Sequence, residues 1–371
     1  MRIGRLHPAA PVVLAPMAGV TNAAFRSLAR QFAPGLVYVS EMVMGQAVLG
    51  RSDRTRRMMY FAPDETPRSI QLYVTNPVVA ADAVRKLVQV VGVDHIDLNF
   101  GCPAPKVTRN GGGSALPLKR NLLRQVVRAA VSNAGDVPVT MKFRIGLTDE
   151  LTTFLDAGRI GADEGCAALA LHARTTEQLY SGTARWSAIG ELKAHVSDVP
   201  VLGNGDIWEA GDALEMMRTT GCDGVVVGRG CLGRPWLFAD LVHTLTTGVP
   251  VTTVPTLGEV MEVMVRHAES LVELHASEHG VHDFRKHAGW YLTGYPVGSE
   301  VRRRFATADT LTDLRALVAE QDPALEAVPG AARIKRGHTN GPRPVHLPDR
   351  YLEHLDDLVA PDEELVAVSG G

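Results

Sequence analysis

The sequence predicts an α/β protein, a (β/α)8 barrel followed by a small C-terminal helical domain. Short apolar runs alternate with amphipathic helical patterns over about two thirds of the chain, and strand signals then disappear. Several of the runs are apolar on both faces, which is typical of strands buried in a parallel sheet. The 371 residues are enough for one barrel-sized domain and a smaller one.

Eight apolar runs, each followed by a turn containing Gly, Asn or Pro, are the predicted strands. They are Val12–Ala15, Leu36–Ser40, Ser69–Tyr73, His95–Asn99, Val139–Phe143, Ala168–His172, Val201–Gly203 and Gly224–Val227. Amphipathic helices are predicted between them, for example at Pro77–Val90, Arg120–Ala134 and Ala210–Thr219. Eight strand–helix units in about 240 residues is the size of a closed barrel, and the number eight favours it over a doubly wound open sheet.

The pattern changes after Trp236, and the following segment has helical periodicity, with apolar positions at Val260, Val263 and Met264. The tail after it contains many Pro, Gly and Arg residues and has an acidic end at Asp362–Glu364, so we expect it to be partly ordered at best. The expected division is a barrel at 1–245, a helical domain at 255–325 and a tail of unknown role at 330–371.

The composition excludes several classes of protein. With 45% hydrophobic and 21% charged residues, the chain is neither disordered nor fibrous. The 38 Lys and Arg against 41 Asp and Glu give no overall sign of a nucleic-acid binder, which is usually basic. No segment has the length and apolarity of a membrane helix. The four scattered cysteines fit a reducing cytoplasm, and no His/Cys cluster has zinc spacing, so we expect a cytoplasmic protein without a metal.

Two glycine-containing loops follow the last two predicted strands, Gly203–Asp206 and Gly228–Gly230. In (β/α)8 barrels these loops often bind phosphate, because glycines let backbone N–H groups approach the phosphate oxygens. Either loop alone could simply form a turn between strand and helix. Both together, with the guanidinium of Arg229, favour a phosphate site.

Three further residues at predicted strand ends could carry chemistry. Lys142 could form a Schiff base, place positive charge beside a flavin, or pair structurally with Glu41 or Asp97. His172 could bond a ring carbonyl or be a satisfied core histidine. Cys102 lies in a turn at the site face; an ordinary thiol has a pKa of about 8.5 and is protonated at neutral pH, so it could act as a general acid.

Taken together, these motifs resemble the tRNA-dihydrouridine synthases, in particular the bacterial branch once described as nitrogen-regulation-like. The NFGCP and LHART motifs are specific in this combination, the resemblance covers about residues 10–320, and the tail has no counterpart. The matching stretches are LAPMAGVTNAAFR (Leu14–Arg26), SEMV (Ser40–Val43), QLYVTNP (Gln71–Pro77), DLNFGCPAPKVTRNGGGSAL (Asp97–Leu116), MKFRIG (Met141–Gly146), LHARTTEQLYSGTARW (Leu171–Trp186), GNGDI (Gly203–Ile207), GVVVGRGCLGRPWLF (Gly224–Phe238) and FRKHAGWYLTGYPVGSEVRRRF (Phe284–Phe305).

The resemblance implies FMN at the barrel mouth, reduced by NADPH or NADH, and reduction of D-loop uridines in tRNA to 5,6-dihydrouridine. The implied cofactor-binding residues are Pro16, Met17, Ala18, Gln71, Lys142, His172, Asn204, Gly205, Asp206, Gly228 and Arg229. Cys102 would protonate carbon 5 of the uracil after hydride reaches carbon 6, and Asn99 would help to hold the base. Arg174, at the strand end beside His172, is also predicted to bind substrate.

Local charge supports an RNA partner despite the overall balance. Five basic residues and only two acids lie between His282 and Arg304, and phosphate contacts need only one basic face. A solvated helix face would look similar, but this one would lie beside a site that must accept RNA. The predicted tRNA-binding residues are Arg285, Lys286, Arg302, Arg303 and Arg304, with a second basic cluster at Arg333, Lys335, Arg336 and Arg343.

Three alternatives stay open at this point. The main one is an FMN-dependent barrel that reduces a free pyrimidine or another small molecule, which would not need a basic helical domain. The others are a Schiff-base lyase that uses Lys142 and a non-catalytic RNA-binding module. The sequence leaves open which uridine is modified, which nicotinamide cofactor is used and the oligomeric state, for which we expect a monomer.

Overall fold

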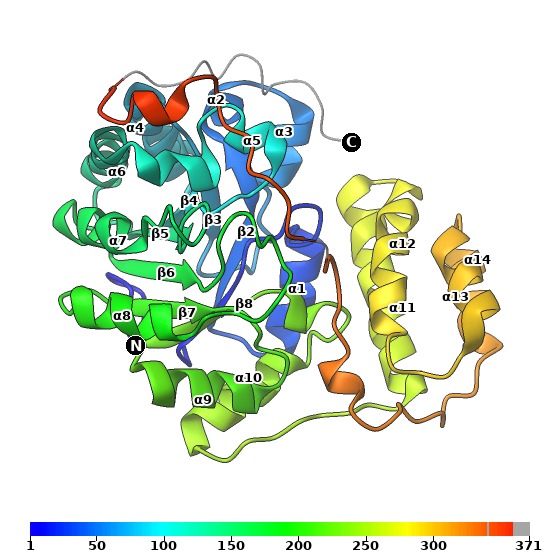
Figure 1. Cartoon of the computed structure of the whole chain (residues 1–371). Coiled ribbons are helices and arrows are strands. Elements are labelled where there is room, and N and C mark those ends of the chain that lie inside the picture. The colour runs from blue at the N-terminus through cyan, green and yellow to red at the C-terminus, as the bar shows by residue number, and fades with distance from the viewer. Residues whose placement is uncertain (340, 359–371) are drawn as a thin grey trace.

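Eight parallel strands form a closed barrel in the computed structural model, which describes residues 1–339 and 341–358 (Figure 1). The predicted fold class is therefore confirmed. The second strand ends at Met44 rather than at Ser40, so Glu41 lies inside it. The strands are β1 Val12–Leu14, β2 Val37–Met44, β3 Ser69–Tyr73, β4 His95–Phe100, β5 Val139–Arg144, β6 Ala168–His172, β7 Val201–Asn204 and β8 Gly224–Val227.

Helices connect the strands and cover the outside of the barrel (Figure 1). They are α1 Ala23–Phe32, α2 Gly45–Leu49, α3 Asp53–Met58, α4 Pro77–Lys86, α5 Pro105–Thr108, α6 Arg120–Asn133, α7 Phe154–Asp163, α8 Ser187–His195, α9 Ala210–Thr220 and α10 Leu237–Thr247. The predicted helix Pro77–Val90 is α4 continued by a π-helical turn at Leu87–Val91. Asn76 caps α4 by accepting from Val78 N and Val79 N.

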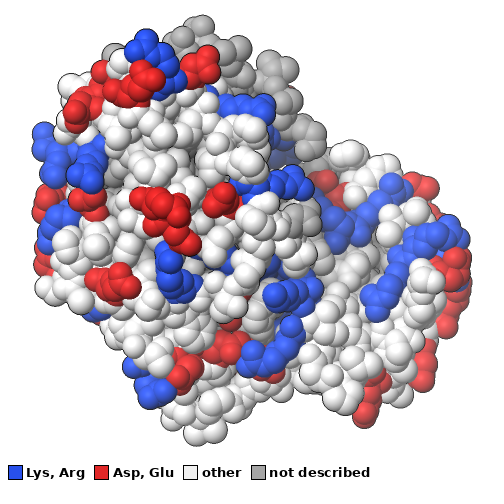
Figure 2. Space-filling view, in the orientation of Figure 1, with Lys and Arg blue, Asp and Glu red and all other residues white. Residues whose placement is uncertain are grey.

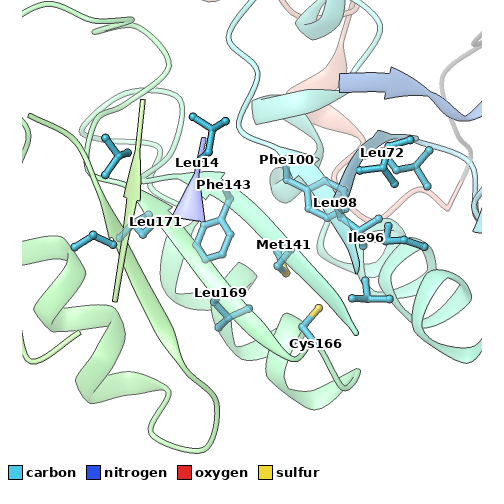
Figure 3. Close-up of a cluster of buried hydrophobic side chains, with 14 of the residues drawn as sticks. Leu14, Leu72, Ile96, Leu98, Phe100, Met141, Phe143, Cys166, Leu169 and Leu171 are labelled. Atoms are coloured by element: carbon cyan, nitrogen blue, oxygen red, sulfur yellow. The ribbon is translucent and has the colours of Figure 1, made fainter. Parts of the chain in front are cut away.

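Side chains of the strands alternate between the helix-covered outside and the barrel interior, as the period of two in a strand requires. Ile96, Leu98 and Phe100 of β4 pack in the main core with residues of β5 and β6 (Figure 3). The intervening His95 and Asp97 belong to the interior, where they line a small cavity. This alternation lets one strand support the core and also supply polar groups to the barrel interior.

In the described part of the chain, four α-helices follow the barrel: α11 Leu257–His275, α12 His279–Tyr291, α13 Gly298–Thr307 and α14 Leu311–Ala319. They form a separate lobe beside the barrel (Figure 1). Their buried core includes Ala24 and Leu28 of α1, so the lobe packs directly on the first barrel helix. Among the described residues, no helix is long and apolar enough to cross a membrane.

The chain after α14 returns to the barrel. Arg234 Nη1 donates to Ala332 O at 3.0 Å, and Arg336 Nη2 donates to Thr293 O at 3.2 Å. Tyr351 is 5% exposed. Up to Leu358, the tail therefore makes more contacts with the rest of the chain than we expected, while the acidic end at Asp362–Glu364 lies outside the described residues.

A fully buried ion pair links α1 to the segment before β3. Arg26 Nε lies 2.5 Å from Glu65 Oε1, and both side chains have no solvent exposure. The guanidinium also donates to Thr21 O at 2.8 Å and to Tyr60 O at 2.9 Å. With these hydrogen bonds in place, the buried charges compensate each other, and loss of either partner leaves the other unpaired in the core.

We therefore predict that Glu65→Ala lowers the free energy of unfolding in urea by about 3–5 kcal/mol. Asp64→Ala is the matched control, because the adjacent Asp64–Arg30 pair has an Asp64 side chain that is 80% exposed. Exposed pairs contribute about 1 kcal/mol or less. Equal losses in the two variants would contradict the assignment.

Candidate functional site

A chain of hydrogen-bonded polar side chains runs through the barrel interior. Gln71 Nε2 donates to Asp97 Oδ2 and Thr140 Oγ1 donates to Asp97 Oδ1, both at 2.7 Å. His95 Nε2 lies 2.9 Å from Thr140 Oγ1. Burial lowers the pKa of His95 to about 4, so its imidazole is neutral. Burial raises the pKa of Asp97, and its bonds to Thr140 and Gln71 oppose that shift.

Asn99 connects this chain to the loop after β4. Its Nδ2 donates to Gln71 Oε1 at 2.7 Å, and its Oδ1 accepts from Gly101 N at 3.1 Å and Cys102 N at 2.9 Å. The amide oxygen is therefore used to shape the loop, and one N–H of the amide is left for a ligand. The predicted contact between Asn99 and a uracil stays a prediction, while its role in holding the loop is directly visible.

Cys102 is a half-buried free thiol. Burial raises the pKa of this thiol, with the Ala104 backbone N–H and the charges of Arg144 and Lys106 acting in the opposite direction. The thiol is therefore protonated at neutral pH. Its carbonyl oxygen accepts from Ser114 N and Ser114 Oγ, each at 3.1 Å. The peptide groups on both sides of the thiol are thus held in place.

Lys142 lies on β5 beside Asn99, its register partner on the neighbouring strand β4. Burial, with a smaller contribution from the charge of Arg144, lowers the pKa of Lys142 to about 8, and the charge of Asp97 opposes this shift. The ammonium is therefore charged at pH 7 but titrates in an accessible range.

Arg144 is a site residue that the sequence analysis did not select. Its Nε donates to Gly101 O, and its Nη1 donates to Thr175 O and Leu179 O, all at 2.9 Å. It therefore ties the loop after β4 to the loop after β6. The sequence signal for Arg144 is its position two residues after Lys142 in the same barrel strand. Residues two apart in a strand face the same side, so both basic side chains should point to the site.

His172 ends β6 and lies opposite Asn204 of β7 and Arg144 of β5. Burial lowers its pKa far below the ordinary value, and the nearby cations Arg144 and Lys142 lower it further. The imidazole is therefore neutral, with one N–H donor and one acceptor. Asn204 Nδ2 donates to Val226 O at 2.7 Å, so this amide joins β7 to β8.

The loops after β7 and β8 form a cradle around buried cations. Arg174 Nη2 lies 2.7 Å from both carboxylate oxygens of Asp206, and its side chain is 1% exposed. Its Nη1 is buried without a partner among the described residues and lies close to Gly205. Arg229 Nη2 is 3.6 Å from Asp206, with its guanidinium over the Tyr180 ring. Arg174 thus lies with the residues predicted to bind the cofactor.

The loop after β1 completes this end of the barrel. A Cβ on Gly228 would lie 3.5 Å from Ala15 Cβ and 3.9 Å from Met17 Sδ, so the β1 and β8 loops are adjacent. Pro16 lines the interior cavity together with Lys142 and Asp97. Ala18, two residues after Pro16, is exposed. The predicted cofactor residues therefore come together at the carboxyl end of the barrel.

The predicted RNA-binding arginines of the helical lobe all have partners. Arg285 pairs with Asp309 and Arg304 with Glu320, so two acids from outside the counted window reduce the positive charge expected there. Arg303 pairs with Glu300, and Arg302 Nη2 donates to Tyr295 O at 2.7 Å. Such exposed pairs are weak, and phosphate can compete for these guanidinium groups.

Lys286 is the predicted RNA-binding residue that reaches the barrel mouth. Its Nζ would lie 3.3 Å from a Cβ on Gly19, in the loop after β1, and 3.8 Å from Asp283. Glu41 accepts from Gly19 N, and burial raises the pKa of this carboxyl while Gly19 N–H and Lys286 lower it. Lys and Arg side chains gather along both sides of the hollow between barrel and lobe (Figure 2).

The second basic cluster is only partly available. Arg336 is 4% exposed and donates to several backbone carbonyls, so its prediction as a surface RNA contact is wrong. Arg333 is bound to Glu209 and Asp212. The sequence shows their charge but not that the tail folds back onto the barrel. In the described ranges, no group of three His, Cys, Asp or Glu side chains could hold a metal ion.

Comparison with known proteins identifies one family by sequence and a shared fold by structure. Residues 13–328 match the family profile described as "Dihydrouridine synthase". The chain is 51% identical to a "Probable tRNA-dihydrouridine synthase" of Mycobacterium tuberculosis, over 100% of this chain and 97% of that protein. It is 39% identical to "tRNA-dihydrouridine synthase B" of Pseudomonas putida, over 89% and 98%. Histamine dehydrogenase from Rhizobium sp. 4-9 shares the fold, with a TM-score of 0.51 at 12% identity over 87% of this chain and 64% of that one.

The tight packing at Gly113 generates a prediction about the Cys102 loop. A Cβ at Gly113 would lie 2.6 Å from Cys102 O, and its φ is +53°. We expect Gly113→Ala to displace the loop, to raise the alkylation rate of Cys102 by iodoacetamide, and to lower the free energy of unfolding. The backbone penalty is about 1–2 kcal/mol, and the clash adds about 1–3 kcal/mol.

Gly135→Ala is the matched control, because Gly135 has a φ of +58° and open space around it. This variant should lose only the backbone contribution and leave Cys102 alkylation unchanged. Identical behaviour of the two variants would show that the close approach to Cys102 is not a real constraint.

Proposed function

Because the chain belongs to the dihydrouridine synthase family, we propose that it reduces specific uridines of tRNA to 5,6-dihydrouridine. The observation that best supports this activity is the protonated, half-buried thiol of Cys102 at the same barrel end as Lys142. Saturation of the C5–C6 double bond requires a hydride and a proton. Cys102 is suited to supply the proton, at carbon 5.

We propose FMN, reduced by NADPH or NADH, as the cofactor, and the residues present fit it. Gly205 has a φ of +132°, and a Cβ there would lie 2.7 Å from Ala184, so this turn requires glycine. The Nη1 of buried Arg174, which has no partner within residues 1–339 and 341–358, and the guanidinium of Arg229 supply donors for a phosphate. Asp206 orients these two cations rather than facing an anion itself. Bound there, FMN would supply the hydride that reaches carbon 6 of the uracil.

The remaining polar residues prepare the site for charge and proton transfer. Lys142 would place a positive charge beside the edge of the flavin ring that becomes electron-rich when the flavin is reduced. Neutral His172 can donate a hydrogen bond to a ring carbonyl without adding charge. Asn99 and Arg144 hold the loop that carries Cys102 from two sides. These residues together fix the thiol relative to the cofactor cradle.

We propose that tRNA lies along the hollow between the barrel and the helical lobe. Lys286 reaches the barrel side of that hollow beside Gly19, and the ion pairs of Arg303 and Arg304 on the same lobe can open to phosphate at modest cost. The target base must leave its stack to enter the barrel mouth, which costs a few kcal/mol. Phosphate contacts on the lobe would compensate that cost. A free pyrimidine is not stacked, so its reduction would not need such contacts.

The first test separates the two half-reactions. We predict that Cys102→Ala leaves flavin reduction by NADPH unchanged within about twofold, and that it slows flavin oxidation by tRNA by about 100-fold or more, the usual contribution of a general acid. Stopped-flow absorbance at the flavin band measures both rates. Equal slowing of the two half-reactions, or no slowing of the second, would contradict the proton-donor role.

The second test uses the titration of Lys142. Its charged form, present below about pH 8, should favour the electron-rich edge of FMN, so binding raises this pKa and takes up a proton. We therefore predict that FMN affinity of the apoprotein falls as pH rises through about 8. Lys142→Met should show weak, pH-independent binding in that range, and Lys142→Arg should keep its affinity to higher pH. Fluorescence titration between pH 6.5 and 9.5 measures this, and an unchanged pH profile in Lys142→Met would contradict the assignment.

A further inference from the structure

The chain from 329 to 358 follows the rim of the barrel. We name this segment, without residue 340, the C-terminal strap. His338 O accepts at 2.8 Å from Nη1 of Arg229, which lies in the loop after β8. Arg343 N donates at 2.9 Å to the carbonyl oxygen of Glu177, which lies in the loop after β6. Figure 1 shows it in orange to red, leaving the helical lobe and crossing to the barrel. The family profile ends at residue 328, before the strap begins.

Near its end, the strap contacts the turn that follows the Cys102 loop through the buried side chain of Tyr351. Tyr351 Oη lies 3.0 Å from Gly111 O and 3.3 Å from Ala115 O, so its single proton is shared between the two carbonyls. Burial raises the pKa of Tyr351, which keeps this hydroxyl a donor. Lys119 Nζ lies 5.0 Å from the centre of the tyrosine ring and 3.9 Å from Asp357, so the neighbouring chain also contacts the strap.

The two carbonyls that Tyr351 contacts enclose the residue that holds Cys102. Ser114 lies between Gly111 and Ala115, and its N–H and hydroxyl both donate to Cys102 O at 3.1 Å. The turn can give these bonds only while it keeps its shape. A short path of hydrogen bonds therefore connects the tyrosine hydroxyl to the peptide of the thiol.

We propose that Tyr351 is a positioning residue that orders the 111–115 turn and so fixes the Cys102 thiol for proton donation. The proposal rests on the proton-donor role proposed above for Cys102. The hydroxyl contributes no proton to the reaction. Loss of the hydroxyl should let the turn and the thiol sample more orientations, and reactions that depend on the thiol should change while others should not.

The test compares Tyr351→Phe with Tyr38→Phe in the flavin-loaded protein. Tyr38 is the matched control, because it is also buried and its hydroxyl also lies near two carbonyls, 3.3 Å from Ala29 O and 2.7 Å from Ala33 O. Both variants keep the aromatic ring and lose one hydroxyl, so their losses of stability should be similar. A purely structural role of Tyr351 would make them alike in every measurement.

Two rates report on the thiol itself. In Tyr351→Phe we expect alkylation of Cys102 by iodoacetamide, followed by mass spectrometry, to become about fivefold faster, the effect of one lost hydrogen bond. Flavin oxidation by tRNA should become about fivefold slower, with flavin reduction by NADPH unchanged. Tyr38→Phe should alter none of these rates. The other three cysteines are buried, so the labelling reports on Cys102.

The outcomes separate this proposal from the one on which it rests. If Cys102→Ala blocks flavin oxidation but Tyr351→Phe changes neither rate, Tyr351 does not position the thiol, although the proton-donor role stands. If Cys102→Ala oxidises normally, the proton-donor role fails. In that case faster alkylation in Tyr351→Phe still supports the link to the turn, and unchanged alkylation overturns it.

Discussion

One side-chain amide, that of Asn99, joins the polar interior of the barrel to the loop that carries Cys102. Its N–H group ends the hydrogen-bonded chain through Gln71, and its oxygen holds two consecutive backbone N–H groups of the loop. The interior chain is buried, so breaking it would leave polar groups unsatisfied at considerable cost. The loop that carries Cys102 is therefore anchored to the barrel core beneath it. This constraint holds the backbone of Cys102, the proton donor that we propose.

The rest of the site follows from the same arrangement of alternating strand faces. Outward residues of β4 and β5 form the core under the helices, while the inward residues form register pairs, Asp97 with Thr140 and Asn99 with Lys142. Positive charge is concentrated at the barrel end, and burial together with the surrounding cations keeps His172 neutral. The family supplies the reaction, and these contacts place the residues that we propose for it at one end of the barrel.

The strands and the cluster of site residues could be predicted from the sequence, because the period of two and the position of strand ends are local properties. The partners of those residues could not, because they lie far away in the sequence. Arg144 contacts Gly101 O, and Arg304 pairs with Glu320 on another part of the lobe. Counting charges within a window therefore overestimated the free basic surface. The contact between Tyr351 and Gly111 spans 240 residues and has no local signature at all.

The central claim, that this chain reduces uridine within tRNA, can be measured directly. Purified protein with FMN and NADPH would be incubated with an unmodified tRNA transcript and, separately, with free uridine, and the nucleosides would be analysed by mass spectrometry. We expect dihydrouridine, heavier than uridine by two hydrogens, from the transcript and far less from free uridine. Formation of no dihydrouridine, or equal reduction of the free nucleoside, would contradict the account.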